Sequence, residues 1–116
     1  MTEPDVIDDP QGYFRDHMTE KDFEKAVVKL AARLNYRVHH VHDSRKVAWE
    51  SDAGFPDWVF ARHDQTIFAE LKKQKGKLEP GQAIWLEVLQ LSGEKAYCWR
   101  PSDFDAIVDI LSANEI

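Results

Sequence analysis

Apolar residues recur every three or four positions in one stretch near the start of the chain. From Phe23 to Leu34 they fall on one side of a helix. The Thr-Glu-Lys-Asp sequence that begins at Thr19 resembles a capping box with aspartate in place of glutamate. Asn35 follows this stretch and tolerates the left-handed conformation in which many helices end. The pattern therefore predicts an amphipathic helix over residues 19–35.

Three runs rich in β-branched and aromatic residues follow this helix and predict strands. The first covers residues 36–42 and is separated from the second by a polar stretch at 43–54. The second and third cover residues 57–61 and 66–71, with only the polar residues 62–65 between them. A connection this short predicts an antiparallel hairpin.

Helical spacing returns over residues 80–92, where Pro80 suits the first position of a helix and Gly93 suits its end. A further strand is expected at 95–100, and a last helix is expected from Ser102 onward. The strand before the helix and the strand after it form a βαβ unit, so they should lie parallel with a right-handed crossover. The sequence thus predicts an α/β fold with a mixed sheet of about four strands flanked by helices on both faces.

Composition sets the limits of this fold. A chain of 116 residues, with 43% hydrophobic and 31% charged residues, suits one globular domain. Residues 1–17 carry several acids, two prolines and no periodic apolar pattern, so we predict a loosely ordered acidic leader before a single domain at 18–116. The one cysteine, Cys98, excludes an internal disulfide framework. No run reaches the roughly 18 apolar residues of a membrane span, and we expect a cytoplasmic protein.

The net charge of −6 at first argues against a nucleic-acid partner, because phosphate binding relies on lysine and arginine. The distribution of charge weakens this argument, because four lysines fall within residues 71–78. The local electrostatic potential, rather than the net charge, governs contact with a phosphate. This run is either a solvated turn or a phosphate-binding surface. In the second case the candidate DNA-binding residues are Lys73, Lys75 and Lys77, with Arg45 and Lys46 from the polar stretch.

An acid and a base stand two positions apart at the end of an otherwise apolar strand. Glu70 and Lys72 therefore project from the same face of the sheet, where both groups need polar partners. Across the hairpin, a two-residue turn would place Asp57 opposite Glu70 or Lys72 on that face. A three-residue loop would place Asp57 opposite Leu71, on the same face only if a bulge intervenes.

Two carboxylates a few ångströms apart repel each other unless a cation lies between them. Ligation by oxygen alone suits Mg²⁺ or Mn²⁺. An ammonium group beside such an ion can orient a water molecule or stabilise the transition state of phosphodiester hydrolysis. The alternatives are a surface ion pair between Glu70 and Lys72 and a turn-capping role for Asp57.

The order and spacing of these residues resemble a known enzyme family. Pro56-Asp57, a spacer of twelve residues and then Glu70-Leu71-Lys72 are similar to the signature of PD-(D/E)xK nucleases. The sequences Gly54-Phe55-Pro56-Asp57 and Phe68-Ala69-Glu70-Leu71-Lys72, together with Gln82, resemble the virus-type replication–repair nuclease (VRR-NUC) domain more narrowly. The resemblance covers about residues 18–111.

This resemblance implies a restriction-endonuclease-like αβββαβ core with an extra C-terminal helix. It also implies Mg²⁺-dependent, structure-selective cleavage of DNA, with small members similar to homodimeric Holliday-junction resolvases. By motif, Asp57 and Glu70 would bind the metal, with a contribution from the Leu71 carbonyl, while Lys72 assists the attacking water and Gln82 orients the site or a phosphate.

The acid that the family carries on its first helix corresponds best to Glu20, which would join both the catalytic and the metal-binding residues. Glu24 lies one helical turn further on and is the alternative. Both positions lie beside the apolar stripe of the predicted helix, from which either side chain could reach inward. A solvated pair of acids at a helix start, favoured by the helix dipole, is the competing interpretation.

Other functions stay open at this stage. The same scaffold could serve as a non-catalytic nucleic-acid-binding module, as a nuclease for flaps or single strands, or as an acidic partner protein that imitates DNA. A zinc site is not favoured, because the histidines lack the cysteines or the His-Glu helix motif that accompany zinc.

Overall fold

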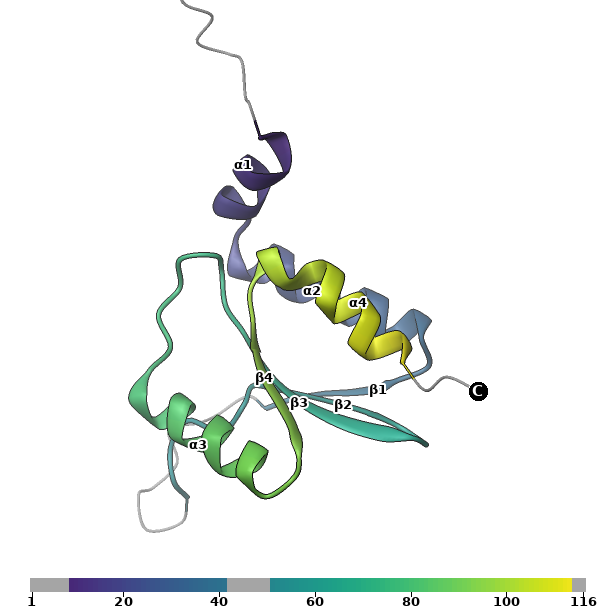
Figure 1. The fold of residues 1–116 in the computed structure, drawn as a ribbon, viewed down its shortest axis with the longest axis vertical. Coiled ribbons are helices and arrows are strands. Elements are labelled where there is room, and N and C mark those ends of the chain that lie inside the picture. Colours follow the sequence, from purple (N-terminus) through teal and green to yellow (C-terminus); the bar gives the residue numbers. More distant parts are fainter. Residues whose placement is uncertain (1–8, 42–50, 114–116) are drawn as a thin grey trace, which may run out of the picture.

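The computed structural model describes residues 9–41 and 51–113, and Figure 1 shows their arrangement. The helices are α1 (Pro10–His17), α2 (Glu20–Arg33), α3 (Pro80–Leu91) and α4 (Phe104–Ser112), with a short 3-10 helix, η1 (Pro101–Asp103), before the last. The strands are β1 (Arg37–His40), β2 (Trp58–Arg62), β3 (Gln65–Leu71) and β4 (Lys95–Trp99). No helix in this part of the chain is long and apolar enough to cross a membrane.

The strands form one mixed sheet in the order β1-β2-β3-β4. The pairs β1–β2 and β2–β3 are antiparallel, whereas β3 and β4 are parallel and are connected through α3. Helices α2 and α4 lie on one side of this sheet and α3 lies on the other (Figure 1). The predicted mixed four-stranded sheet between two helical layers is therefore confirmed.

Helix α2 matches its prediction closely. The Thr19 hydroxyl accepts a hydrogen bond from the Asp22 amide at 3.0 Å, as a capping residue does. Past the other end, Asn35 adopts a left-handed conformation with φ 72°. Phe23 and Val27 on the inner side are fully buried.

The hairpin has a two-residue turn. Arg62 pairs with Gln65, and the pairing continues to Trp58 opposite Ala69. Each strand thus includes one residue next to the turn that the sequence pattern had assigned to the connection. The Arg62 guanidinium donates to the Asp64 carboxylate at 2.7 and 3.0 Å and closes the turn.

The two faces of the sheet have different neighbours. Alternate residues of the central strands, such as Phe60 and Ile67, pack in one buried cluster with Phe23 of α2 and Leu111 of α4. On the opposite face, Phe68 of β3 meets Phe55, which in turn contacts Trp85 of α3 in edge-to-face geometry. Glu70 follows Phe68 on this second face, so α3 and not α2 covers the predicted site.

The predicted acidic leader at residues 1–17 includes helix α1 over residues 10–17, which the apolar pattern did not predict. The Asp9 carboxylate accepts from the Gly12 amide at 3.0 Å, and Pro10 occupies the first turn. Tyr13 stacks on His17 with ring centroids 4.0 Å apart. No residue of α1 is buried, so the helix leaves no periodic apolar signal in the sequence. Residues 1–8 lie outside the described part of the chain.

Candidate active site

Asp57 and Glu70 come together at the open end of the β2–β3 hairpin. Because Trp58 pairs with Ala69, the next position outward places Asp57 beside Glu70 on the same face. The Asp57 amide donates to Glu70 Oε1 at 3.3 Å, while its carbonyl accepts from the Val41 amide at 2.7 Å. The structure therefore shows the two-residue-turn alternative, in which the two acids are neighbours.

Two glycines allow the segment that carries Asp57 to cross the start of α3. Gly54 has φ +100°, and a Cβ there would lie 2.4 Å from the carbonyl carbon of Gly81. A Cβ on Gly81 would in turn lie 2.8 Å from the Ala53 carbonyl oxygen. Only glycine fits at either position, and the close contact brings the chain before β2 against the residues that begin α3. The sequence motif before Asp57 includes Gly54, whereas Gly81 has no counterpart among the predicted site residues.

Gln82 holds the Glu70 carboxylate from the other side. Its Nε2 donates to Glu70 Oε2 at 3.1 Å, while its Oε1 accepts from the Glu79 amide at 2.8 Å. Since the helix start occupies the carbonyl end of the Gln82 amide, the NH₂ end is directed to Glu70. The spacing of Glu79 and Gln82, three residues apart at a helix start, is the sequence signal of a capping box and would have predicted the contact between Gln82 and the Glu79 amide, but not the contact with Glu70.

Glu70 is a buried acid whose negative charge is only partly balanced by the positive charge nearby. Its side chain is 1% exposed, and Lys72 Nζ lies 3.8 Å from Oε2, beyond hydrogen-bond distance. Burial raises the pKa of Glu70 to about 8, with the nearby Asp57 carboxylate adding to the rise and Lys72 opposing it. The surroundings therefore favour a bound proton or a further cation at this carboxyl group.

The structure does not bring the acids of α2 to this pair. Glu20 is exposed at the first position of α2, and Glu24 Oε2 accepts from Trp58 Nε1 at 3.1 Å. Helix α2 covers the face of the sheet opposite Glu70, because its apolar stripe packs on the other set of strand residues. Within residues 9–41 and 51–113, no group of three or more His, Cys, Asp or Glu side chains is arranged to hold a metal ion. The metal-binding roles of Glu20 and of the Leu71 carbonyl remain predictions.

The candidate DNA-binding lysines follow the site directly. Lys73, Lys75 and Lys77 are exposed in the turn between β3 and α3, which begins at Lys72. We call residues 72–77 the lysine turn. Arg45 and Lys46 lie outside the described residues.

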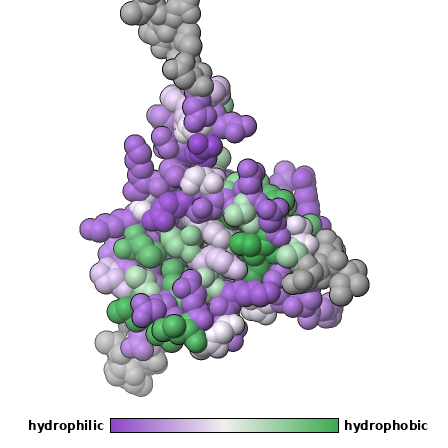
Figure 2. All heavy atoms as spheres, in the orientation of Figure 1, coloured by the Kyte–Doolittle hydropathy of each residue, from purple (hydrophilic) through white to green (hydrophobic). Residues whose placement is uncertain are grey.

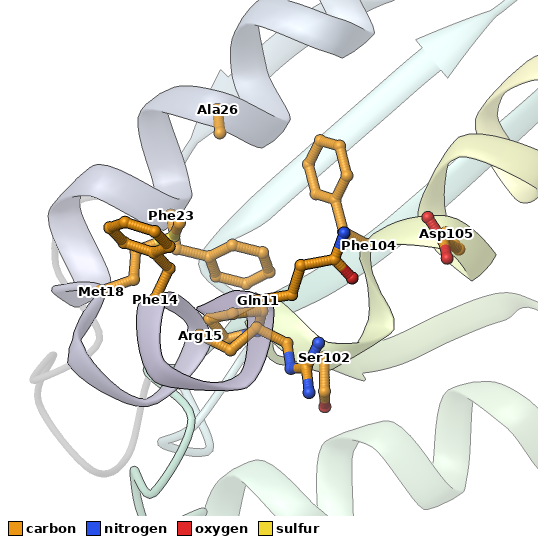
Figure 3. Close-up of a pocket in the computed structure, with 10 residues that line it drawn as sticks. Gln11, Phe14, Arg15, Met18, Phe23, Ala26, Ser102, Phe104 and Asp105 are labelled. Carbon is orange, nitrogen blue, oxygen red and sulfur yellow. The ribbon is translucent and has the colours of Figure 1, made fainter. Parts of the chain in front are cut away.

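A separate cavity of about 370 Å³ lies between α1 and the helical layer of α2, η1 and α4 (Figure 3). Phe14, Phe23 and Phe104 supply much of its apolar lining. None of its lining residues belongs to the Asp57–Glu70 pair or to the partners of that pair. The cavity is therefore distinct from the candidate active site.

A comparison with models of known protein families finds no match for this chain, and a comparison with curated proteins finds no significant match. The carboxylates of Asp57 and Glu70 are neighbours, and the charge of the buried Glu70 is only partly balanced by Lys72. Such a pair of oxygen ligands suits Mg²⁺ or Mn²⁺.

We expect a Glu70→Gln substitution to change how stability depends on pH in the absence of metal. The folded-state pKa of about 8 lies above the ordinary value of 4.5, so the protonated carboxyl group is the form that folding favours. Its stabilising contribution is complete below pH 4.5 and is lost as the pH rises toward about 8. Over this interval the free energy of unfolding of the wild type should fall relative to the variant, by up to a few kcal/mol.

Urea unfolding in chelator at a series of pH values measures this difference. Glu94→Gln, a change at an exposed position, is the matched control and should show no such trend. A constant difference between wild type and Glu70→Gln across the pH series would contradict the buried, uncompensated state of Glu70.

Proposed function

We propose that this protein is a metal-dependent endonuclease that hydrolyses phosphodiester bonds in structured DNA. The observation that carries the proposal is the meeting of Asp57, buried Glu70 and Lys72 on one face of the sheet. The order of α2, β1, β2, β3, α3 and β4 supports a restriction-endonuclease-like core, as the resemblance to VRR-NUC domains implies.

Each residue of the site has a role in this mechanism. Asp57 and Glu70 would hold the cation, and Gln82 fixes the orientation of the Glu70 carboxylate. When bound, Mg²⁺ or Mn²⁺ supplies a Lewis acid and lowers the pKa of a coordinated water. Lys72 orients the attacking water or stabilises the negative charge that develops on the phosphate oxygens.

The charge beside the site supports a nucleic-acid substrate. The exposed lysines of the lysine turn bind backbone phosphates next to the Asp57–Glu70 pair, although the whole chain has a net charge of −6. We propose branched DNA, such as a Holliday junction, as the substrate, which the resemblance implies. A flap or a single strand is the alternative substrate.

We also propose that the enzyme is a homodimer. Ile84, Val88 and Leu91 of α3 are 64%, 53% and 79% exposed. They recur at helical spacing, and Figure 2 shows hydrophobic residues gathered over this helix. Burial of this apolar surface against a second copy would stabilise a dimer in which each α3 also carries Gln82 of its own site.

We expect Asp57→Ala and Glu70→Ala to abolish metal-dependent cleavage, lowering the rate by more than about 100-fold. The assay uses labelled four-way junction, flap and duplex DNA with Mg²⁺, Mn²⁺ or chelator. Glu94→Ala is the control for loss of an exposed acid, and circular dichroism checks the fold. Lys72→Ala should slow cleavage at saturating DNA more than it weakens binding.

Two outcomes would separate the candidate functions. Equal cleavage by wild type and Asp57→Ala would exclude the proposed site. DNA binding without cleavage under every metal condition would favour a non-catalytic binding module on the same scaffold.

We expect a Lys75→Ala/Lys77→Ala double variant to weaken DNA binding and to reduce its salt dependence. Each lost phosphate contact lowers the slope of log affinity against log salt by about 0.9, so the double variant should lose about 2. Lys21→Ala/Lys25→Ala removes two exposed lysines from α2 and should leave the slope unchanged. An unaltered slope in the first variant would remove the lysine turn from the DNA contact.

A Val88→Glu/Leu91→Glu variant tests the dimer, since buried, unpaired carboxylates at an interface oppose association. Sedimentation should show a dimer for the wild type and a monomer for this variant. Ala32→Glu, at an exposed position of α2, controls for the added charge. A monomeric wild type at assay concentrations would contradict the proposal, as would a variant that stays dimeric.

A further inference from the structure

The lysine turn is attached to the segment that follows β4. Gln74 Nε2 donates to the Ser102 hydroxyl at 3.0 Å, and the Ser102 amide donates to Gln74 Oε1 at 2.9 Å. Both ends of one side-chain amide are thus used on a single residue of η1. This two-point contact fixes the middle of the turn against η1.

Arg100 makes a second attachment, from the end of β4. Its Nη2 donates to the Gly76 carbonyl at 2.8 Å, and its Nη1 lies 3.4 Å from Cys98 Sγ. Its own amide donates to the Asp103 carboxylate at 2.8 Å, which holds the residue at the start of η1. One guanidinium therefore joins the far end of the lysine turn to strand β4.

Strand β4 is also the direct neighbour of β3, the strand that carries Glu70. Cys98 is the neighbour of Glu70 in the parallel β3–β4 pairing. The charges of Arg100, Glu70 and Lys72 all act on the pKa of the Cys98 thiol, which burial raises. The pairing also continues beyond the strand, because the Lys72 amide donates to the Trp99 carbonyl at 2.9 Å. Arg100 and the carboxylate pair are thus connected through a single rigid pair of strands.

We propose that Arg100 is a positioning residue that holds the lysine turn at a fixed place relative to Glu70. A DNA backbone bound by the turn then presents one phosphodiester to the Asp57–Glu70 pair. Arginine is suited to this role because its planar guanidinium donates to two acceptors at once, which a lysine ammonium does not do in the same fixed geometry. The proposal rests on the proposed nuclease function.

The effect of the position of the lysine turn can be tested separately from the effect of its charge. Arg100→Lys keeps the positive charge but loses the fixed bridge between Cys98 and Gly76. DNA affinity and its salt dependence should therefore stay within about twofold of the wild type. The single-turnover cleavage rate at saturating DNA should fall at least about tenfold, because small misplacements of the reacting groups are costly. The cut positions should also spread over neighbouring phosphates.

The experiment compares Arg100→Lys with Gln74→Ala, which removes the other attachment without any change in charge. Arg33→Gln, an exposed arginine of α2, is the control. The readouts are DNA affinity in chelator, single-turnover rate, cut positions and hydrogen exchange of the Gly76 amide, which donates to the Lys73 carbonyl within the turn. We expect faster exchange and lower rates in both attachment variants. If Arg100→Lys does not fold, Gln74→Ala alone carries the test.

Wild-type cut positions and rates in both attachment variants would overturn the proposal, and so would a loss of cleavage that saturating DNA restores. The proposed function fails by a different result, namely cleavage that does not depend on Asp57. A wild type that cleaves through Asp57, combined with unaffected attachment variants, would reject only the role of Arg100.

Discussion

The buried carboxyl group of Glu70 is the constraint on which the candidate site depends. An acid that is 1% exposed costs free energy unless its charge is balanced, and a second acid, Asp57, lies beside it. The Gln82 amide and the Asp57 amide satisfy its oxygens, but Lys72 remains 3.8 Å away. These partners orient the carboxylate without neutralising it, and a pKa of about 8 is the consequence. An apolar residue at this position would avoid this cost, so the proposed metal site would account for an acid that stability alone does not favour.

The rest of the fold determines where this acid can act. The two-residue turn sets the register that puts Asp57 beside Glu70, and a shift of one residue would send one of the acids to the other face. The contact between Gly54 and Gly81 then holds the segment before β2 against the start of α3. Because α3 also supplies Gln82, the parallel βαβ unit and the hairpin contribute to one site.

Periodicity in the sequence was enough to predict α2, the hairpin and the parallel βαβ unit, because each leaves a strong local pattern. It could not predict α1, whose residues are all at least partly exposed and show no apolar stripe. The resemblance implied a metal-binding role for Glu20, and the place of Glu20 and Glu24 beside the apolar stripe of α2 allowed either side chain to reach inward. The stripe in fact packs on the opposite face of the sheet, which only the tertiary arrangement determines. The contacts of Gln74 with Ser102 and of Arg100 with Gly76 join polar residues that are distant in the sequence, and no local rule pairs them.

The distribution of charge near the site is compatible with the proposed DNA substrate, although the whole chain is acidic. Lys72, the exposed lysines of the lysine turn and Arg100 all belong to the end of the β3–β4 pair where Glu70 lies. The two carboxylates repel phosphate most strongly while both are ionised and no cation is bound, and burial already disfavours the ionised form of Glu70. A divalent cation would therefore strengthen the attraction of this surface for DNA while it completes the proposed site. In the proposed enzyme, metal binding and DNA binding would therefore be linked through the same buried carboxyl group.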